Sequence, residues 1–376
     1  MKSVLTNKYS SGFTLVEMMV ALTLGIIVLA GIGQVFIKTK RASVFQDELA
    51  RMQENSRYAI QLLNKEIRNA GYLGCRHASN MDAAYLDTGG TYLDNSSLAI
   101  EGYEADGTTP GSPFTLGATS TGWSGGNGTE ATLPTVLNSP LLVAGSDIVI
   151  IRYANGSGLT LAQDKQNNSD VQVTNVSKEI NGCSGGASDG FSGLCIGDLA
   201  IVSDCERARS FQIDSLALDG SGVLTVHDAT GVNWVGEHSS TIPFTIADSS
   251  LFEARTVAFF VRNNNATPAV PALYRKIGSG NAQELVEGVE NMQVVYGEDT
   301  DNDGVPNRYL AAHQVTNFSN VVSIQLSLLL RTIRESSRRS PAAQTLSMLS
   351  TDVTTPADHH YRQVFTATIQ LRNPDE

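Results

Sequence analysis

The sequence contains little charge, few cysteines and few aromatic residues for its length. Only 17% of its 376 residues are charged, and acids outnumber bases by 38 to 26, for a formal net charge of −12. This acidic excess disfavours binding of the whole domain to nucleic acid or to an anionic membrane surface, so we expect no nucleic-acid partner. With 41% hydrophobic residues, the chain nevertheless has enough apolar side chains to fold around a sizeable core.

Short motifs of common catalytic sites are also scarce. The sequence contains no HExxH metalloprotease motif and no phosphate-binding P-loop. Serine, histidine and aspartate occur, but not in a recognisable catalytic constellation. We therefore predict that the chain is not an enzyme.

The four cysteines are Cys75, Cys183, Cys195 and Cys205, and no two of them form a CxxC pair. This spacing gives poor support for a zinc site. An even number of cysteines in an exported chain indicates two disulfides, with three pairings open. Cys183 and Cys195 bracket a glycine-rich loop that can bring them together. Free buried thiols are the alternative.

The longest apolar run extends from Phe13 to Ile37, 25 residues with Glu17 as their only charge. At about 1.5 Å per residue, such a helix crosses a hydrocarbon core of about 30 Å. The preceding segment, MKSVLTNKYSSG, contains two lysines and no acid. A secretory signal peptide carries its small-residue cleavage site after the apolar region, whereas Gly12 lies before it here. We therefore expect the span to remain attached and the later, cysteine-containing residues to lie on the oxidising side.

Glu17 is the unusual residue of this span. A charged side chain at the centre of a membrane helix costs about 3 kcal/mol, so we expect Glu17 to be paired, protonated or functional. The alternative is a carboxylate that reaches the headgroups from the start of the helix, where the helix dipole favours a negative charge.

Residues 12–17, Gly-Phe-Thr-Leu-Val-Glu, resemble the type III signal of bacterial prepilins: a short basic leader, a glycine, and Phe-Thr-Leu-x-Glu. The resemblance implies that a prepilin peptidase cuts between Gly12 and Phe13 and methylates the new amine of Phe13. Residues 1–12 are then the leader peptide and 13–37 the transmembrane and polymerisation helix. A Glu17 carboxylate near the Phe13 amine of a neighbouring subunit would neutralise it and set the axial register.

The helical pattern continues beyond the membrane span. Apolar residues recur at spacings of three and four up to Ala70, no proline interrupts residues 13–70, and Gly71 is a stop signal. We predict one helix over about 13–70, whose amphipathic half, 38–71, buries its apolar stripe against the body. A free coiled coil is the alternative.

From residue 72 the sequence is rich in turns and in short alternating runs typical of strands. We expect strands at 147–153, 171–176, 198–204, 210–218, 256–263, 292–299, 321–333 and 364–373. Residues 105–132 contain little apolar sequence and predict a surface loop. The expected fold is α+β and pilin-like: the long helix packs on an antiparallel sheet, and a large β-rich elaboration completes a periplasmic domain over 72–376.

The C-terminal segments ELVEGVENMQVVYGEDTDNDGVPNRY, NVVSIQLSLLLRT and FTATIQLRN resemble the PilW family of minor pilins. That resemblance implies a low-abundance subunit in the bacterial inner membrane that primes type IV pilus assembly together with other minor pilins and the pilus machinery, at the pilus tip. A pseudopilin of a type II secretion system and a tip-located adhesin or ligand-binding module are the alternatives.

Asp299, Asp301 and Asp303, followed by Gly304, match the first half of a calcium-binding loop. The twelfth position of such a loop is Leu310, so the usual bidentate glutamate is missing. Calcium is therefore one interpretation, and a hairpin loop built from Asp, Asn and Gly is the other.

Overall fold

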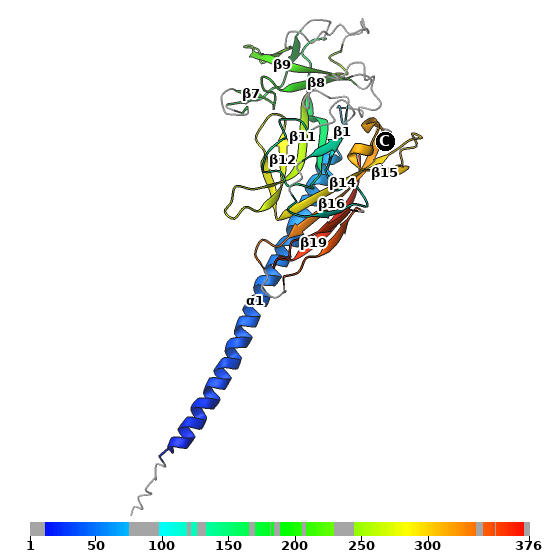
Figure 1. Cartoon of the computed structure of the whole chain (residues 1–376). Helices are drawn as coiled ribbons and strands as arrows, with labels where there is room; N and C mark the ends of the chain where they lie inside the picture. The colour runs from blue at the N-terminus through cyan, green and yellow to red at the C-terminus, as the bar shows by residue number, and fades with distance from the viewer. Residues whose placement is uncertain are drawn as a thin grey trace, which may run out of the picture.

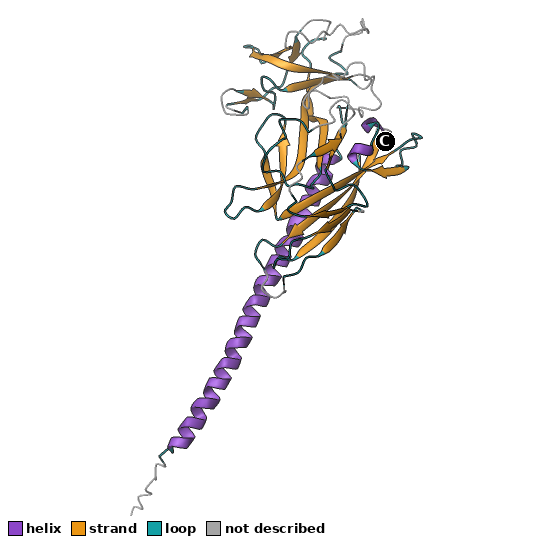
Figure 2. Ribbon diagram, in the orientation of Figure 1, coloured by secondary structure: helices purple, strands orange, loops and turns teal. Residues whose placement is uncertain are grey.

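A computed structural model describes residues 12–74, 98–118, 122–125, 133–164, 170–180, 182–183, 189–204, 208–228, 244–335, 341–349 and 351–371. One long helix, α1 (Leu15–Ile67), leads into a body made almost entirely of β-strands (Figure 2). The first half of α1 protrudes alone, and its second half lies along the body (Figure 1). The predicted α+β class and the single long helix are confirmed.

Three features of the sequence define α1. Thr14 caps its start, no proline interrupts it, and Gly71, with φ +77°, takes the left-handed conformation just past its end. Its buried apolar residues recur at helical spacing along one face: Met52, Ala59, Leu63 and Ile67. These residues share one core with the body, so the stripe is buried against the β-strands rather than in a coiled coil.

The largest sheet has ten strands in the order β3-β1-β4-β11-β8-β9-β10-β5, with β12 paired to β11 and β13 paired to β12. Its strands are β1 (Ile100–Ala105), β3 (Trp123–Gly125), β4 (Ile148–Thr160), β5 (Val171–Val173), β8 (Leu199–Ser203), β9 (Ala208–Leu218), β10 (Leu224–Asp228), β11 (Ser250–Asn263), β12 (Pro271–Ile277) and β13 (Gln283–Glu287). All its pairings are antiparallel. The two long strands β4 and β11 pair with each other and connect the part of the sheet near the helix to a distal lobe (Figure 1). The distal lobe consists of β5, β8, β9 and β10.

The second sheet has the order β15-β14-β16-β19 and lies along α1 (Figure 1). Its strands are β14 (Val289–Glu298), β15 (Arg308–Leu310), β16 (Val321–Arg331) and β19 (Arg362–Gln370), with 3-10 turns η3 (Ala312–Gln314) and η4 (Phe318–Asn320) between β15 and β16. One face of β16 carries alternating apolar residues, among them Ile324, Leu326 and Leu328, that pack in the same core as the helix stripe. The helix therefore covers this sheet as the alternation predicts.

The opposite face of β16 is covered as well, which the sequence did not indicate. Leu329 packs with Phe114 and Leu116 and with two small strands, β17 (Thr345–Met348) and β18 (Thr351–Thr354). β2 (Pro113–Thr115) pairs in parallel with β18 and forms a three-stranded sheet. The remaining two-stranded sheet consists of β6 (Lys178–Glu179) and β7 (Gly190–Phe191) in the distal lobe.

The prediction that residues 105–132 form only a surface loop is wrong for the described part of that segment. It contributes β2 and β3, and Phe114, Leu116 and Trp123 are buried. Trp123 donates from its indole N–H to the carbonyl of Ser146 at 2.8 Å. Two aromatic side chains were enough to anchor a polar segment to two different cores, because each buries a large apolar area.

Candidate functional site

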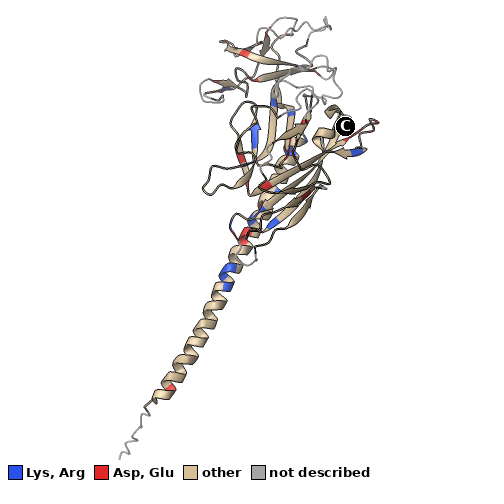
Figure 3. Ribbon diagram, viewed as in Figure 1, with Lys and Arg blue, Asp and Glu red and all other residues tan. Residues whose placement is uncertain are grey.

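The protruding half of α1 is the first candidate site. Its apolar side chains point outward: Phe13 is 89% exposed, and residues 15–29 are exposed without exception. Figure 3 shows almost no charge along this part of the helix. By length and composition, α1 is able to cross a membrane. So large an apolar surface on all sides of one helix requires a lipid or protein environment.

Gly12 and Phe13 lie just before α1, and Glu17 lies in its first turn. Thr14 and Glu17 form a reciprocal capping box: the Glu17 N–H donates to Thr14 Oγ1 at 3.2 Å, and the Thr14 N–H donates to Glu17 Oε2 at 3.0 Å. The Thr14 hydroxyl also donates to Oε2 at 3.0 Å.

The two bonds that Glu17 accepts, from the N–H and the hydroxyl of Thr14, therefore share one carboxylate oxygen, Oε2. Among the described residues, Oε1 accepts no hydrogen bond. The capping box holds the carboxylate at the start of the helix and leaves one oxygen free for a group outside the chain. Pairing with an external amine remains chemically available in this geometry.

The second half of α1 is attached to the body by polar contacts as well as by its apolar stripe. Glu48 is buried, and its Oε2 accepts the N–H groups of Ile333 and Arg334, each at 3.1 Å. At the far end of the helix, Glu66 accepts from the Tyr153 hydroxyl at 2.7 Å. Neither carboxylate was identified from the sequence, because both lie in a charge pattern typical of a solvated helix face.

Of the three pairings left open by the sequence, the structure has the one across the glycine-rich loop: Cys183 and Cys195 are bonded, with an S–S distance of 2.07 Å. The loop that it closes contains β7, and β6 lies just before it in the chain. Cys75 and Cys205 lie outside the described residues. Since one pairing uses Cys183 and Cys195, a bond between Cys75 and Cys205 stays a prediction, which peptide mapping without reduction tests.

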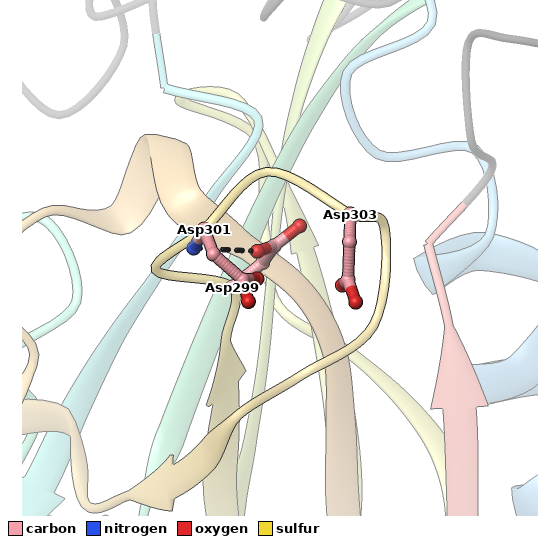
Figure 4. Close-up of side chains that lie close together, drawn as sticks. All are labelled: Asp299, Asp301 and Asp303. Atoms are coloured by element: carbon pink, nitrogen blue, oxygen red, sulfur yellow. Dashed lines mark hydrogen bonds between the residues drawn. The ribbon is translucent and has the colours of Figure 1, made fainter.

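The three aspartates of the candidate calcium loop lie together after β14 (Figure 4). Each offers a carboxylate oxygen, and these oxygens lie within 4.8 Å of one another. Asp299 is buried, whereas Asp301 and Asp303 are exposed.

Backbone contacts occupy much of this loop. Asp299 accepts the N–H groups of Asn302 at 2.7 Å and Gly304 at 2.8 Å through different oxygens. Burial opposes its ionisation, but these bonds and a third from the Asp301 N–H lower the pKa of Asp299 below its ordinary value. Asn302 and Gly304 both have positive φ, as in tight loops of Asp, Asn and Gly. The geometry thus accounts for the motif as a hairpin loop. The carboxylates of Asp301 and Asp303 are exposed and accessible to a cation, although Asp303 also accepts the Val305 N–H at 2.8 Å.

A buried carboxylate pair, which the sequence did not reveal, joins the two large sheets. Asp147 accepts the N–H of Ala105 at 2.9 Å and that of Val294 at 2.8 Å, so one side chain bridges β1 and β14. Burial and the nearby Asp147 charge raise the pKa of Glu104 to about 9, and burial raises that of Asp147 to about 7. Above this pair lies the buried Tyr296 hydroxyl, which has no hydrogen-bond partner among the described residues.

Two basic residues at the end of β16 and just after it, Arg331 and Arg334, lie near acids. Arg331 pairs with Glu290 at 3.3 Å, and Arg334 approaches Glu48 at 3.9 Å. Arg338 and Arg339 lie outside the described residues. The expectation of no nucleic-acid partner stays a prediction.

Two family models match the chain. Residues 258–373, from β11 to beyond β19, match the model of the type IV pilus-assembly protein W, PilW. Residues 7–33 match the prokaryotic N-terminal methylation motif. No curated protein and no solved structure matches the chain. The N-terminal match covers the start of the apolar helix α1. The C-terminal match covers the second sheet, which packs on the other half of that helix.

Proposed function

We propose that the chain is a minor pilin of the PilW type that primes type IV pilus assembly in a complex with other minor pilins, at the pilus tip; the matches of residues 258–373 and 7–33 support this. The observation that carries the proposal is the prepilin-type N-terminus on an outward-facing apolar helix, joined to an elaborated body. A subunit with so large a distal lobe suits an end position, where only one face of the body must pack on further subunits. In this proposal the chain acts as a structural component of the pilus.

Processing follows from the same signal. In our proposal a prepilin peptidase cleaves between Gly12 and Phe13 and methylates the Phe13 amine, and the body lies in the periplasm until the subunit leaves the inner membrane. Support comes from the exposed position of both residues ahead of α1.

Glu17 then sets the register of assembly. Its free Oε1 accepts the Phe13 amine of a neighbouring subunit, and two charges that are costly in lipid neutralise each other. The capping box supports this role because it holds the carboxylate close to the start of its own helix.

Deletion of the gene tests the priming role. We expect the deletion strain to lose surface pili, and a strain that also lacks retraction to recover only some of them. The wild-type gene should restore piliation. Normal piliation of the deletion strain in both backgrounds would sink the proposal. Loss of secreted enzymes with normal piliation would instead indicate a type II secretion pseudopilin.

Glu17→Gln tests the register, with Glu54→Gln as the matched control on the exposed face of the same helix. We expect both variants to insert in the membrane and to be cleaved. Only Glu17→Gln should be absent from sheared pili. Equal incorporation of the two variants would contradict a role for the carboxylate.

A further inference from the structure

A cleft of about 670 Å³ opens in the large sheet where β11 changes partner. β11 pairs with β8 through residues 250–254 and with β12 from residue 257 onward. The cleft lies over the short stretch between these pairings. One wall is the start of β8 with the disulfide-bonded loop, and the other is the turn between β12 and β13. Its volume is that of an ordinary ligand site.

Glycines line the walls and keep the cleft open: Gly182, Gly193, Gly197, Gly278 and Gly280. A Cβ atom at Gly193 would lie 3.1 Å from the Glu253 carboxylate, and one at Gly182 would lie 2.7 Å from the Glu179 side chain. Larger residues at these two positions would therefore crowd the acidic side chains of the cleft.

Three acids and one base face the cleft. Glu253 is paired: it accepts from Arg255 Nε and from the Asn155 amide, each at 2.8 Å. Glu179 accepts the backbone N–H of Gly193 at 3.2 Å and forms no ion pair among the described residues. Asp198 forms no ion pair among the described residues, although it lies close to both Glu253 and Arg255. The cleft thus has an excess of negative charge: Arg255 is the one base among its described lining residues, and it is already hydrogen-bonded to Glu253.

The Asp198 carboxylate is poorly compensated where it stands. Burial raises its pKa to about 6, and repulsion from Glu253 adds to the effect of burial. A cation entering the cleft would relieve both the desolvation and the repulsion. Two exposed isoleucines flank the lining residues Glu179, Cys195 and Gly197 along the chain: Ile180 is 77% exposed and Ile196 is 53% exposed. Exposed apolar side chains that adjoin cleft-lining residues in the sequence fit a ligand that is itself both cationic and apolar.

We propose that this cleft binds a lysine or arginine side chain presented by a polypeptide, whose neighbouring apolar residues contact Ile180 and Ile196. The acidic walls match the cation, and the cleft is open enough to admit a side chain from outside. That the polypeptide belongs to a neighbouring pilus subunit rests on the proposed function; the cation site itself does not. The disulfide loop and β8 precede residues 258–373, so the walls they form lie outside the region matched by the PilW model.

The test uses the full chain in neutral detergent micelles and two probe peptides, acetyl-Ile-Gly-Lys-Gly-amide and its glutamine counterpart. Saturation-transfer NMR measures their binding at low salt. We expect the lysine peptide to bind and the glutamine peptide not to bind. Asp198→Asn should weaken binding about tenfold, since a hydrogen bond to a charged group is lost. Glu179→Gln should weaken it as well.

Asp214→Asn is the control, because Asp214 is an exposed acid on β9 outside the cleft and its loss changes the net charge equally. Its affinity should equal that of the unmodified chain. Equal weakening by Asp198→Asn and Asp214→Asn, or equal binding of the two peptides, would overturn the proposal. Melting temperatures confirm that each variant is folded. Because the assay uses purified protein, failure of the priming role leaves its outcome unaffected, and the reverse also holds.

Discussion

At the scale of single residues, three buried carboxylates act as acceptors for backbone N–H groups. Glu48, Asp147 and Asp299 are all buried, and each accepts two or more backbone N–H groups. A buried N–H without a partner costs about 1–3 kcal/mol, so each side chain stabilises the segment whose donors it satisfies. These acids explain part of the acidic excess without any external basic partner.

Calcium binding by the aspartate loop is tested at the same scale. If Asp301 and Asp303 complete a cation site, Asp301→Asn with Asp303→Asn should abolish binding of calcium in calorimetric titration of the full chain. Asp352→Asn, an exposed acid elsewhere, is the control. If the unmodified chain releases no heat with calcium, the motif is a hairpin loop only.

The buried pair Glu104 and Asp147 predicts an unusual pH dependence of stability. Their pKa values are raised to about 9 and about 7 in the folded protein, above those of the unfolded chain. The folded state therefore binds more protons, and stability falls as pH rises from about 5 towards 9.

Glu104→Gln removes the group whose pKa is raised further while keeping its shape. We expect the free energy of unfolding between pH 5 and pH 9 to fall less steeply in this variant, by up to about 1.4 kcal/mol per pH unit, as measured by denaturant unfolding at each pH. Asp352→Asn should keep the slope of the unmodified chain. Parallel slopes for Glu104→Gln and the unmodified chain would contradict a buried, protonated Glu104.

At the scale of secondary-structure elements, the attachment of α1 depends on Glu48. Glu48→Ala leaves the N–H groups of Ile333 and Arg334 without their acceptor, at an expected cost of about 1–3 kcal/mol in stability. Glu54→Ala, on the exposed face, should change stability by less than about 0.5 kcal/mol. Thermal unfolding of both variants measures the difference. Equal melting temperatures would mean that water replaces the carboxylate.

The elements predicted correctly from the sequence are those whose apolar residues recur at regular helical or alternating spacing. The helix expected over 13–70 runs from Leu15 to Ile67, and the alternating run at 321–333 is β16. The other expected strands also appear, several with shifted ends: the run at 256–263 is the second half of β11, which begins at Ser250. Here local pattern and tertiary packing agree, so the pattern was sufficient.

Other elements were missed because their apolar content is low or because packing decides them. β1, IEGYEA, carries two glutamates and a glycine yet is fully buried. Glu101 is buried in an ion pair with Arg152 at 2.7 Å, and only glycine fits at 102, where a Cβ would lie 1.9 Å from the Tyr296 hydroxyl. Such burial depends on partners about 50 and nearly 200 positions away, and no local window contains them.

The cleft was missed for the same reason. Its acids come from β6, the start of β8 and β11, which are separated in sequence and meet only because β11 pairs first with β8 and then with β12. The aspartate loop was found because its three acids lie within five consecutive residues.

At the scale of the whole molecule, the chain consists of a body that folds around the second half of α1 and a first half that the body does not cover (Figure 1). Phe45 packs edge-on against Tyr361, with ring centroids 5.9 Å apart, and Glu48, Leu49 and Met52 follow it into contact with the body. The exposed apolar residues of 13–37 contribute nothing to this core.

Two N-terminal truncations test whether only the second half of α1 belongs to the folded body. Removal of residues 1–37 should give a water-soluble protein that melts within about 2 °C of the full chain in detergent, because no buried side chain is lost. Removal of residues 1–52 also removes Phe45, Glu48 and Met52. Deletion of one buried apolar side chain costs about 2–5 kcal/mol, so this fragment should melt more than about 5 °C lower or fail to fold. If instead the longer fragment, 38–376, aggregated while carrying an intact Cys183–Cys195 bond, the exposed half of α1 would be part of the folded core rather than only its anchor.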